Sequence, residues 1–148
     1  MDDVELDFMI AHIRDKSKSF DGDHVLRDAP MSEDRITELE RERNIVLNRQ
    51  YRRFLMTYGA GDFLYSQIYS FDPNSDWNLW RESDFVDGIG TTILPFSDNG
   101  AGDYLAFKLL DGKCSDCVYW IDHELGYTIS DSEYEDFNKW VAECALQT

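Results

Sequence analysis

The fold is decided by residues 91–109, which read TTILPFSDNGAGDYLAFKL. β-Branched, aromatic and other apolar residues at its two ends predict strands at Thr91–Phe96 and Tyr104–Leu109. Between them lies Asp98–Asp103, whose Gly, Asp and Asn residues are typical of a tight turn. Two strands joined by such a turn pair in the antiparallel sense. We therefore expect a β-hairpin at this point of the chain.

Further strands are predicted on either side of the hairpin, where apolar residues recur with a period of two. One or two strands are expected within residues 63–71, and another at Val118–Ile121, which ends at Asp122-His123-Glu124. Turns are expected at Asp72–Asp76 and Asp111–Asp116, and a single helical turn at Trp77–Arg81. The chain after residue 62 is therefore expected to be a meander of strands.

The chain before residue 62 is helical by its apolar period. A first helix is expected from Asp3 to about Lys16, because its apolar residues form one stripe: Leu6, Met9, Ile10 and Ile13. Ser32 is the expected N-cap of a second helix that ends near Arg43. Asn48 is the expected N-cap of a third helix, with Gly59 as its C′ residue. Residues 17–31 are interpreted as a surface loop.

A closing helix is predicted from Ser132 to Leu146. Its expected stripe has spacings of three and four residues: Tyr134, Phe137, Val141 and Cys144. The order of helices, strands and a last helix predicts an α+β fold. With 148 residues and no composition break, the chain is expected to be one domain spanning residues 1–148.

The charge is strongly negative and unevenly spread. The chain holds 14 basic and 30 acidic residues, a formal net charge of −16, yet 43% of it is hydrophobic and 14% aromatic, as in a folded protein. Residues 1–61 carry a net −3 and residues 62–148 a net −13. This charge argues against direct binding to nucleic acid or to anionic membranes, whose phosphates attract Lys and Arg. It favours a basic partner or a solvated acidic surface.

The sequence gives no sign of export or membrane insertion. Its acidic start, Met1-Asp2-Asp3-Val4-Glu5, is unlike a signal peptide, and no apolar run approaches the ~20 residues of a membrane helix. Three cysteines are an odd number. We expect a reduced, cytoplasmic protein.

Motifs that carry chemistry are weak in this chain. Cys114 and Cys117 form a C-x-x-C, but only Cys144 and His123 remain as further soft ligands, so we expect no metal. The paired glycines lack the setting of a dinucleotide loop, and no cofactor is expected. Asp122-His123-Glu124 invites acid–base chemistry, yet no nucleophile motif accompanies it. A structural histidine at a strand end is the favoured interpretation.

Trp77 and Trp80 lie in an acidic, turn-rich segment rather than in a core pattern. Aromatic residues beside carboxylates are typical of a hot spot for protein binding. A lid that packs on the sheet explains them equally well.

Taken in order, these motifs resemble the SUKH superfamily, the Smi/Knr-related group of bacterial immunity proteins and yeast cell-wall regulators. The resemblance covers about residues 32–146. It rests on an aromatic helix, with Tyr51, Phe54, Leu55 and Tyr58-Gly59-Ala60-Gly61, and on a hairpin, with Leu94-Pro95-Phe96 and Gly102-Asp103-Tyr104. A strand with its end at residues 118–124 and a closing helix with Phe137 and Trp140 complete the resemblance. The family's usual Leu-Pro before the aromatic helix is here Leu47-Asn48. A cap replaces that proline, since both begin helices.

The resemblance implies a central, largely antiparallel sheet flanked by about four helices. It also implies a non-enzymatic immunity protein (an antitoxin) that binds and neutralises a cognate toxin, commonly a nuclease. An acidic protein would suit the basic groove of such a toxin. We expect binding through the acidic second half of the chain, with two tryptophan anchors: Asp72, Asp76, Trp77, Trp80, Asp84, Asp87, Asp98, Glu124 and Asp131.

Two other functions remain open. A scaffold or regulatory interaction module is suggested by the yeast relatives of the family. A small acid–base enzyme would use His123, with Asp122 and Asp103 as further acid–base groups or ligands.

Overall fold

A computed structural model describes residues 1–17, 28–63 and 66–146, without the side chains of residues 16, 17 and 131–133. Helices α1 to α5 are Asp3–Ser17, Glu33–Arg43, Arg49–Thr57, Leu79–Glu82 and Phe137–Trp140, with a 3₁₀ turn η1 (His123–Leu125) and a π-helical turn η2 (Val141–Ala145). Strands β1 to β7 are Gly61–Phe63, Ser66–Ile68, Ile93–Asp98, Tyr104–Leu110, Lys113–Cys114, Val118–Asp122 and Thr128–Tyr134.

The strands form one antiparallel sheet in the order β1-β2-β3-β4-β6-β7, and β5 pairs with β4. This confirms the predicted α+β fold. The hairpin of residues 91–109 is also confirmed, because β3 and β4 pair with Leu94 opposite Phe107 and Asp98 opposite Tyr104. The register shifts between Pro95 and Ser97, and such a bulge accommodates a proline inside a sheet.

The predicted helix caps are also confirmed. The Ser32 hydroxyl accepts a hydrogen bond from the Arg35 amide at 3.2 Å. The Asn48 side chain accepts from the amides of Gln50 and Tyr51 at 3.0 and 3.1 Å. Gly59, at φ 93°, follows the end of α3 in the left-handed region. The predicted loop at 17–31 lies largely outside the described residues.

The predicted closing helix is wrong over its first five residues. Residues up to Tyr134 belong to strand β7, which pairs with β6, and the helix begins at Phe137. Asp136 separates the two elements: its backbone is extended, and its side chain caps α5 by accepting from the Lys139 amide at 2.7 Å. Tyr134 still reaches the helical turn, because its hydroxyl lies 2.8 Å from Cys144 Sγ.

Two other boundaries differ from expectation. The predicted turn at Asp111–Asp116 contains the short strand β5, whose Cys114 pairs with Leu109. The one or two strands expected within residues 63–71 are β1, which begins at Gly61, and β2, which stops at Ile68. Beyond it the backbone still touches the sheet, since the Tyr69 amide donates to the Phe96 carbonyl at 2.8 Å.

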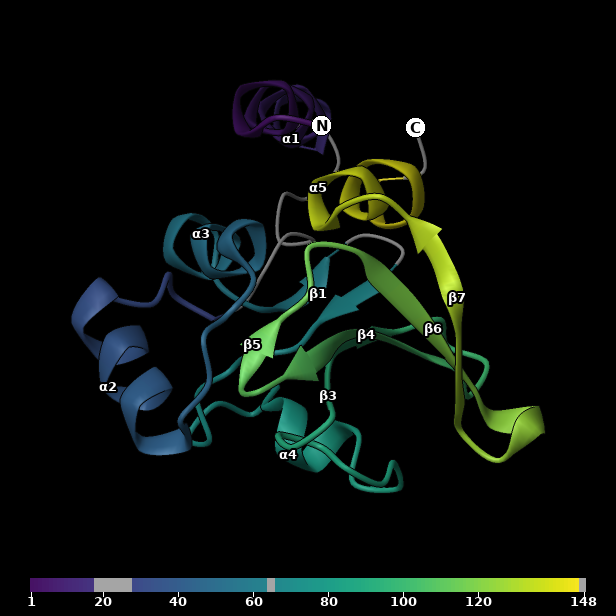
Figure 1. Cartoon of the computed structure of the whole chain (residues 1–148). Coiled ribbons are helices and arrows are strands. Elements are labelled where there is room, and N and C mark those ends of the chain that lie inside the picture. The colour runs from purple at the N-terminus through teal and green to yellow at the C-terminus, as the bar shows by residue number, and fades with distance from the viewer. Residues whose placement is uncertain (18–27, 64–65, 147–148) are drawn as a thin grey trace.

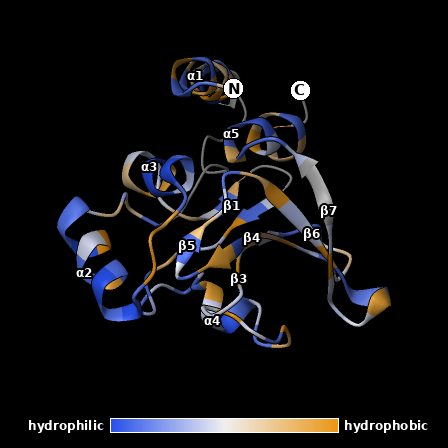
Figure 2. Cartoon of the chain, in the orientation of Figure 1, coloured by the Kyte–Doolittle hydropathy of each residue, from blue (hydrophilic) through white to orange (hydrophobic). Residues whose placement is uncertain are grey.

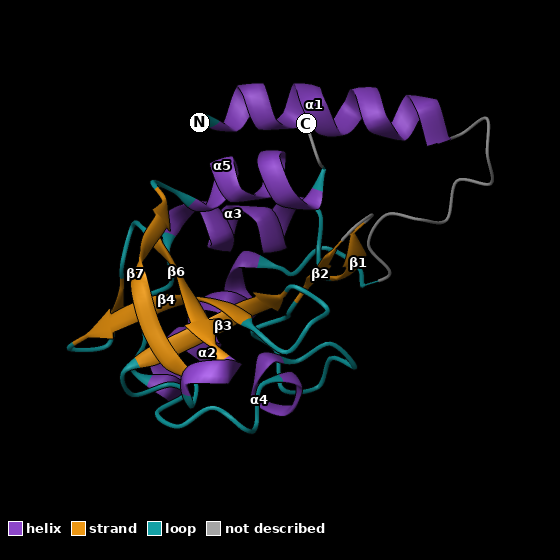
Figure 3. Ribbon diagram, turned by 90° about the vertical axis from the view of Figure 1, so that its right-hand side faces the viewer, coloured by secondary structure: helices purple, strands orange, loops and turns teal. Residues whose placement is uncertain are grey.

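The main core lies between one face of the sheet and the helices. Alternation along β3 and β4 directs Leu94, Phe96, Leu105 and Phe107 to this face, where all are buried. Phe137 of α5 meets them, with its ring centroid 5.2 Å from that of Phe96. Figure 3 shows α3 and α5 between α1 and the sheet, and α4 on the opposite side. Figure 2 shows hydrophobic colour along the central strands and mostly hydrophilic colour along α2.

The opposite face of the sheet has a much smaller core. Ile93, Ala106 and Ile121 point to it and are buried under Val86, which comes from the loop between α4 and β3. Tyr104, Tyr127 and Ile129 pack at its border and are only partly buried. Helices α1, α3 and α5 therefore lie on one side of the sheet, whereas α4 and the loop after it cover part of the second face, which stays partly open (Figure 1).

Candidate binding surface

A row of cross-strand partners runs across the second face of the sheet. Asp98 of β3 lies opposite Tyr104 of β4, Tyr104 opposite Ile121 of β6, and Ile121 opposite Ile129 of β7. Residues directly opposite one another in a sheet point to the same face. The β-hairpin thus places a carboxylate beside a half-buried tyrosine.

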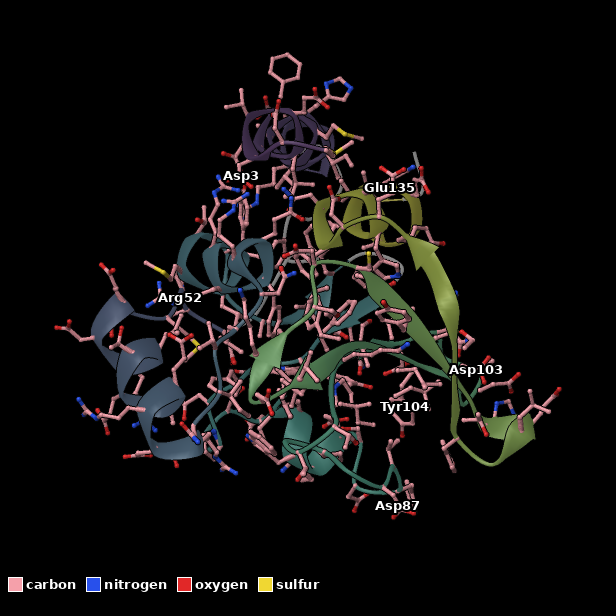
Figure 4. The ribbon with its side chains drawn as sticks, in the orientation of Figure 1. Asp3, Arg52, Asp87, Asp103, Tyr104 and Glu135 are labelled. Carbon is pink, nitrogen blue, oxygen red and sulfur yellow. The ribbon has the colours of Figure 1, made fainter. Side chains whose placement is uncertain are left out.

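The loop between α4 and β3 borders this row. Val86 packs onto the sheet, and its neighbour Phe85 is 73% exposed, with Asp84 and Asp87 on either side of the pair. The Tyr104 hydroxyl donates to the carbonyl of Glu82 at 3.2 Å, which ties the loop to the sheet. We call the combined surface the acidic sheet face and define it by these residues: Asp84, Phe85, Asp87, Asp98, Tyr104, Tyr127 and Ile129. Figure 4 labels Tyr104 and Asp87 on this side.

The tyrosines of this face are held in fixed positions. Their ring centroids lie 6.2 Å apart. Tyr127 adopts φ 59°, an unusual conformation for a bulky residue, and its amide donates to the Asp122 carbonyl at 2.8 Å. Burial raises the pKa of Tyr104, and the charges of Tyr127, Asp98, Asp84 and Glu82 raise it further.

Carboxylates of this face lack basic partners of their own. Within the described ranges, neither Asp84, Asp87 nor Asp98 forms an ion pair. Asp98 accepts instead from the Tyr69 hydroxyl and from the Gly100 amide. The negative potential of the face is therefore left uncompensated.

Asp103 and His123 form a polar clamp beside this face. Asp103 Oδ1 accepts from the His123 amide at 3.0 Å and lies 2.5 Å from His123 Nδ1. The hydrogen bond to Asp103 raises the pKa of His123, and the same bond lowers the pKa of Asp103. Gly102, at φ 103°, packs so closely that a Cβ there would lie 3.1 Å from His123 Cγ. The clamp thus fixes the turn of the hairpin to the end of β6.

The structure brings together the three residues of the acid–base alternative. Ligand atoms of Asp103, Asp122 and His123 all lie within 4.8 Å of one another, the one such cluster among the described residues. Asp122 is used as a cap, since its Oδ1 accepts from the Glu124 amide at 2.9 Å. In the described part of the chain, the three cysteines belong to no such cluster, and no Ser, Thr or Cys side chain bonds to His123.

The residues expected to bind a toxin fall into two groups. Asp84, Asp87 and Asp98 belong to the acidic sheet face, and Glu124 is exposed on η1, next to the His123 clamp. Around the start of α4 lie the others whose side chains are described: Asp72, Asp76, Trp77 and Trp80. The side chain of Asp131, on β7, lies outside the described residues.

The second group is engaged in internal contacts. Burial would raise the pKa of Asp72, but the hydrogen bond from Arg35 lowers it, with guanidinium Nη2 3.0 Å from Asp72 Oδ1. The Arg43 guanidinium lies 3.9 Å from the Trp80 ring centroid, and Phe71 packs on the same ring at 5.9 Å. Trp80 therefore packs within the molecule, as the lid alternative expects, while Asp76 stays exposed.

Sequence reasoning missed the aromatic part of the acidic sheet face. Phe85, Tyr104 and Tyr127 were not among the expected contact residues. Phe85 had a local signal, because it stands in the run Asp84-Phe85-Val86-Asp87, where an apolar side chain interrupts acidic ones. Tyr104 had no such local signal, because only the pairing of β3 with β4 brings Asp98 beside it.

Comparison with known proteins points to one family. The family model SUKH_6, described as SMI1-KNR4 cell-wall, matches residues 33–141. No curated protein matches the sequence. Among the described helices, none combines the length and apolar character needed to cross a bilayer.

Proposed function

The chain belongs to the SUKH family, which includes immunity proteins, and on this premise we propose that it binds and neutralises a cognate toxin. The observation that supports the proposal is the acidic sheet face. It combines an exposed Phe85, two half-buried tyrosines and carboxylates that have no basic partner in the described residues. Aromatic anchors in a surface with a complementary charge are typical of protein interfaces.

We expect the toxin to present a basic surface, as nucleases do. A nuclease binds phosphates with Lys and Arg, so its substrate groove attracts an acidic protein. Opposite fields raise association rates to ~10⁸–10⁹ M⁻¹s⁻¹ at low salt. Fast capture protects a cell, because an active toxin damages it until the toxin is bound. Neutralisation would follow if the acidic sheet face covers that groove.

The direct test is co-expression with the toxin domain encoded beside this gene. We expect rescue of growth and a stable complex that co-purifies. Association should slow steeply as salt increases, because the Debye length falls from ~10 Å at 0.1 M to ~3 Å at 1 M. Rescue by a complex whose association does not depend on salt would contradict steering by charge.

The face itself is tested by a pair of double variants with equal charge change. Asp84→Asn with Asp87→Asn removes two charges from the acidic sheet face, and Glu42→Gln with Glu143→Gln removes two exposed charges elsewhere. We expect the first pair to slow toxin association several-fold more than the second. Phe85→Ala should speed dissociation, because an anchor contributes mainly after encounter. Equal effects of the two pairs would place the interface elsewhere.

The acid–base alternative keeps one supporting observation, the cluster of Asp103, Asp122 and His123. His123→Ala separates it from the binding function. If the folded variant still protects cells and still binds the toxin, catalysis by His123 is excluded. Loss of protection with toxin binding retained would favour the enzyme instead.

A further inference from the structure

Two partly buried aromatic rings of this protein are covered by its own cations. Arg43 lies over Trp80, with 3.9 Å between the guanidinium carbon and the ring centroid. Lys108 Nζ lies 4.1 Å from the ring centroid of Tyr119. A cation over an aromatic face is attracted by the negative face of the ring. These two pairs show that a partly buried ring in this fold can hold a cation on its face.

Tyr104 and Tyr127 differ from these rings. In the described part of the chain, no Arg or Lys lies over either ring. Carboxylates are near this pair, because Asp98 is the cross-strand partner of Tyr104 and Asp84 follows two residues after Glu82, whose carbonyl accepts from the Tyr104 hydroxyl at 3.2 Å. A cation of a partner that binds here is attracted both by the faces of the two rings and by carboxylates that form no ion pair in the described residues.

The ring pair is also rigid. The Tyr104 hydroxyl is fixed by its bond to the Glu82 carbonyl at 3.2 Å, and the Tyr127 backbone is held at φ 59° by its 2.8 Å bond to Asp122. A non-glycine residue in this conformation is strained and persists only where its surroundings impose it. A fixed platform loses little side-chain entropy when a ligand stacks on it.

We propose that the Tyr104–Tyr127 platform with Asp84 and Asp98 is an arginine subsite, which binds a guanidinium of the partner in preference to an ammonium. Only a planar guanidinium stacks flat on a ring while its edge donates two parallel hydrogen bonds to a carboxylate. A lysine ammonium can lie over a ring, as Lys108 does over Tyr119, but it is a compact, strongly hydrated charge that cannot stack flat and donate two parallel hydrogen bonds to a carboxylate. This inference rests on the proposed function, for which it names the side chain that the toxin presents.

The probes are hexa-arginine and hexa-lysine peptides, which share length and charge. Titrations followed by backbone amide shifts should place both peptides at the acidic sheet face. We expect hexa-arginine to bind about five-fold tighter, which corresponds to about 1 kcal/mol at 25 °C. Equal affinities for the two peptides, or binding of neither at this face, would overturn the inference.

Matched variants separate stacking from charge. Tyr127→Leu removes one ring but keeps apolar bulk, and should weaken hexa-arginine more than hexa-lysine, which reduces the arginine preference. Tyr104→Phe keeps the ring and should retain the preference, and it serves as the control if Tyr104→Leu fails to fold. Asp84→Asn should weaken both peptides. A preference that survives in folded Tyr127→Leu and Tyr104→Leu proteins would refute the platform.

The toxin experiment stays distinct from this one. If this protein rescues growth from the cognate toxin but shows no arginine preference, the subsite is refuted and the immunity function remains intact. An arginine preference without rescue would leave the subsite intact and refute the toxin partner.

Discussion

Asn48 performs two tasks, and a short series of variants can measure each. Its side-chain oxygen caps α3 by accepting from the Gln50 and Tyr51 amides at 3.0 and 3.1 Å. Its amide nitrogen donates to the Ser115 carbonyl at 2.9 Å, which ties α3 to the loop before β6. The side chain is buried, at 5% exposure. Asn48→Ala removes both contacts at once.

The expected loss is the sum of two contributions. An N-cap replaced by alanine costs about 1 kcal/mol. A buried carbonyl that loses its donor costs about 1–3 kcal/mol. We therefore expect Asn48→Ala to lower the free energy of unfolding by about 2–4 kcal/mol. For a chain of 148 residues each kcal/mol lowers Tm by about 3 °C, so Tm should fall by about 6–12 °C.

The assay is urea unfolding followed by tryptophan fluorescence. Asn48→Ser is the matched control, because a serine hydroxyl caps the helix but does not replace the amide donor to Ser115. It should recover about 1 kcal/mol of the loss. A serine variant as stable as the wild type would show that the tie to Ser115 contributes nothing. An alanine variant within about 0.5 kcal/mol of the wild type would refute both tasks.

Three further predictions concern the core and the hairpin clamp. Phe137→Ala should lower the free energy of unfolding by about 3–5 kcal/mol, because the buried ring packs on five aromatic neighbours. Urea unfolding measures this loss, and a loss under about 1 kcal/mol would contradict a central place of Phe137 in the core. Gly102→Ala should cost about 1–3 kcal/mol, since alanine at φ 103° is strained and its Cβ meets the His123 ring; thermal unfolding checks it. Because the pKa of His123 is raised in the folded protein, its pairing with Asp103 stabilises the fold at pH values below 6.5, the ordinary pKa of histidine. This stabilisation is lost as the pH rises through the raised pKa of the folded protein. Because the pKa of Asp103 is lowered in the folded protein, the same pairing stabilises the fold at pH values above 3.8, the ordinary pKa of aspartate. This stabilisation is lost as the pH falls through the lowered pKa of the folded protein. The stability difference between the wild type and His123→Gln should therefore be larger at pH 5.5 than at pH 8.5, and an unchanged difference would argue against the ion pair.

The sequence was most informative where the deciding contacts are local. The caps Ser32 and Asn48 were predicted correctly, because each bonds to amides two or three residues away. The hairpin was predicted for the same reason, since its turn residues lie next to one another. Its strands end within about two residues of the expected positions.

Prediction failed where distant pairing decides the structure. The spacing of Tyr134 and Phe137 fits a helix, but pairing with β6 holds Tyr134 in a strand, opposite Val118. Asp136 then begins the helix, and an Asp three residues before Lys139 was a cap signal that the longer apolar stripe obscured. Strand β5 is only two residues long and needs β4 to exist.

The candidate surface divides in the same way. Composition alone indicated acidic residues in the second half of the chain, and the structure places Asp84 and Asp87 in the loop after α4 and Asp98 opposite Tyr104. Which aromatic residues join them could not be derived locally. Tyr104 and Tyr127 lie on different elements, and the structure brings their ring centroids to 6.2 Å.

The net charges of −3 and −13 in the two parts of the chain do not show where in the fold the acidic residues are compensated. Arginines of the first half neutralise carboxylates around the helices: Arg35 binds Asp72, Arg49 binds Asp3, and Arg52 binds Glu40. Of the four bases after residue 62, none forms an ion pair with Asp84, Asp87 or Asp98 in the described residues. Arg81 pairs with Glu82, Lys108 lies over Tyr119, and the other two are on β5 and α5. Because the helical side is self-neutralised, a basic partner is drawn mainly to the sheet side, where the aromatic anchors are.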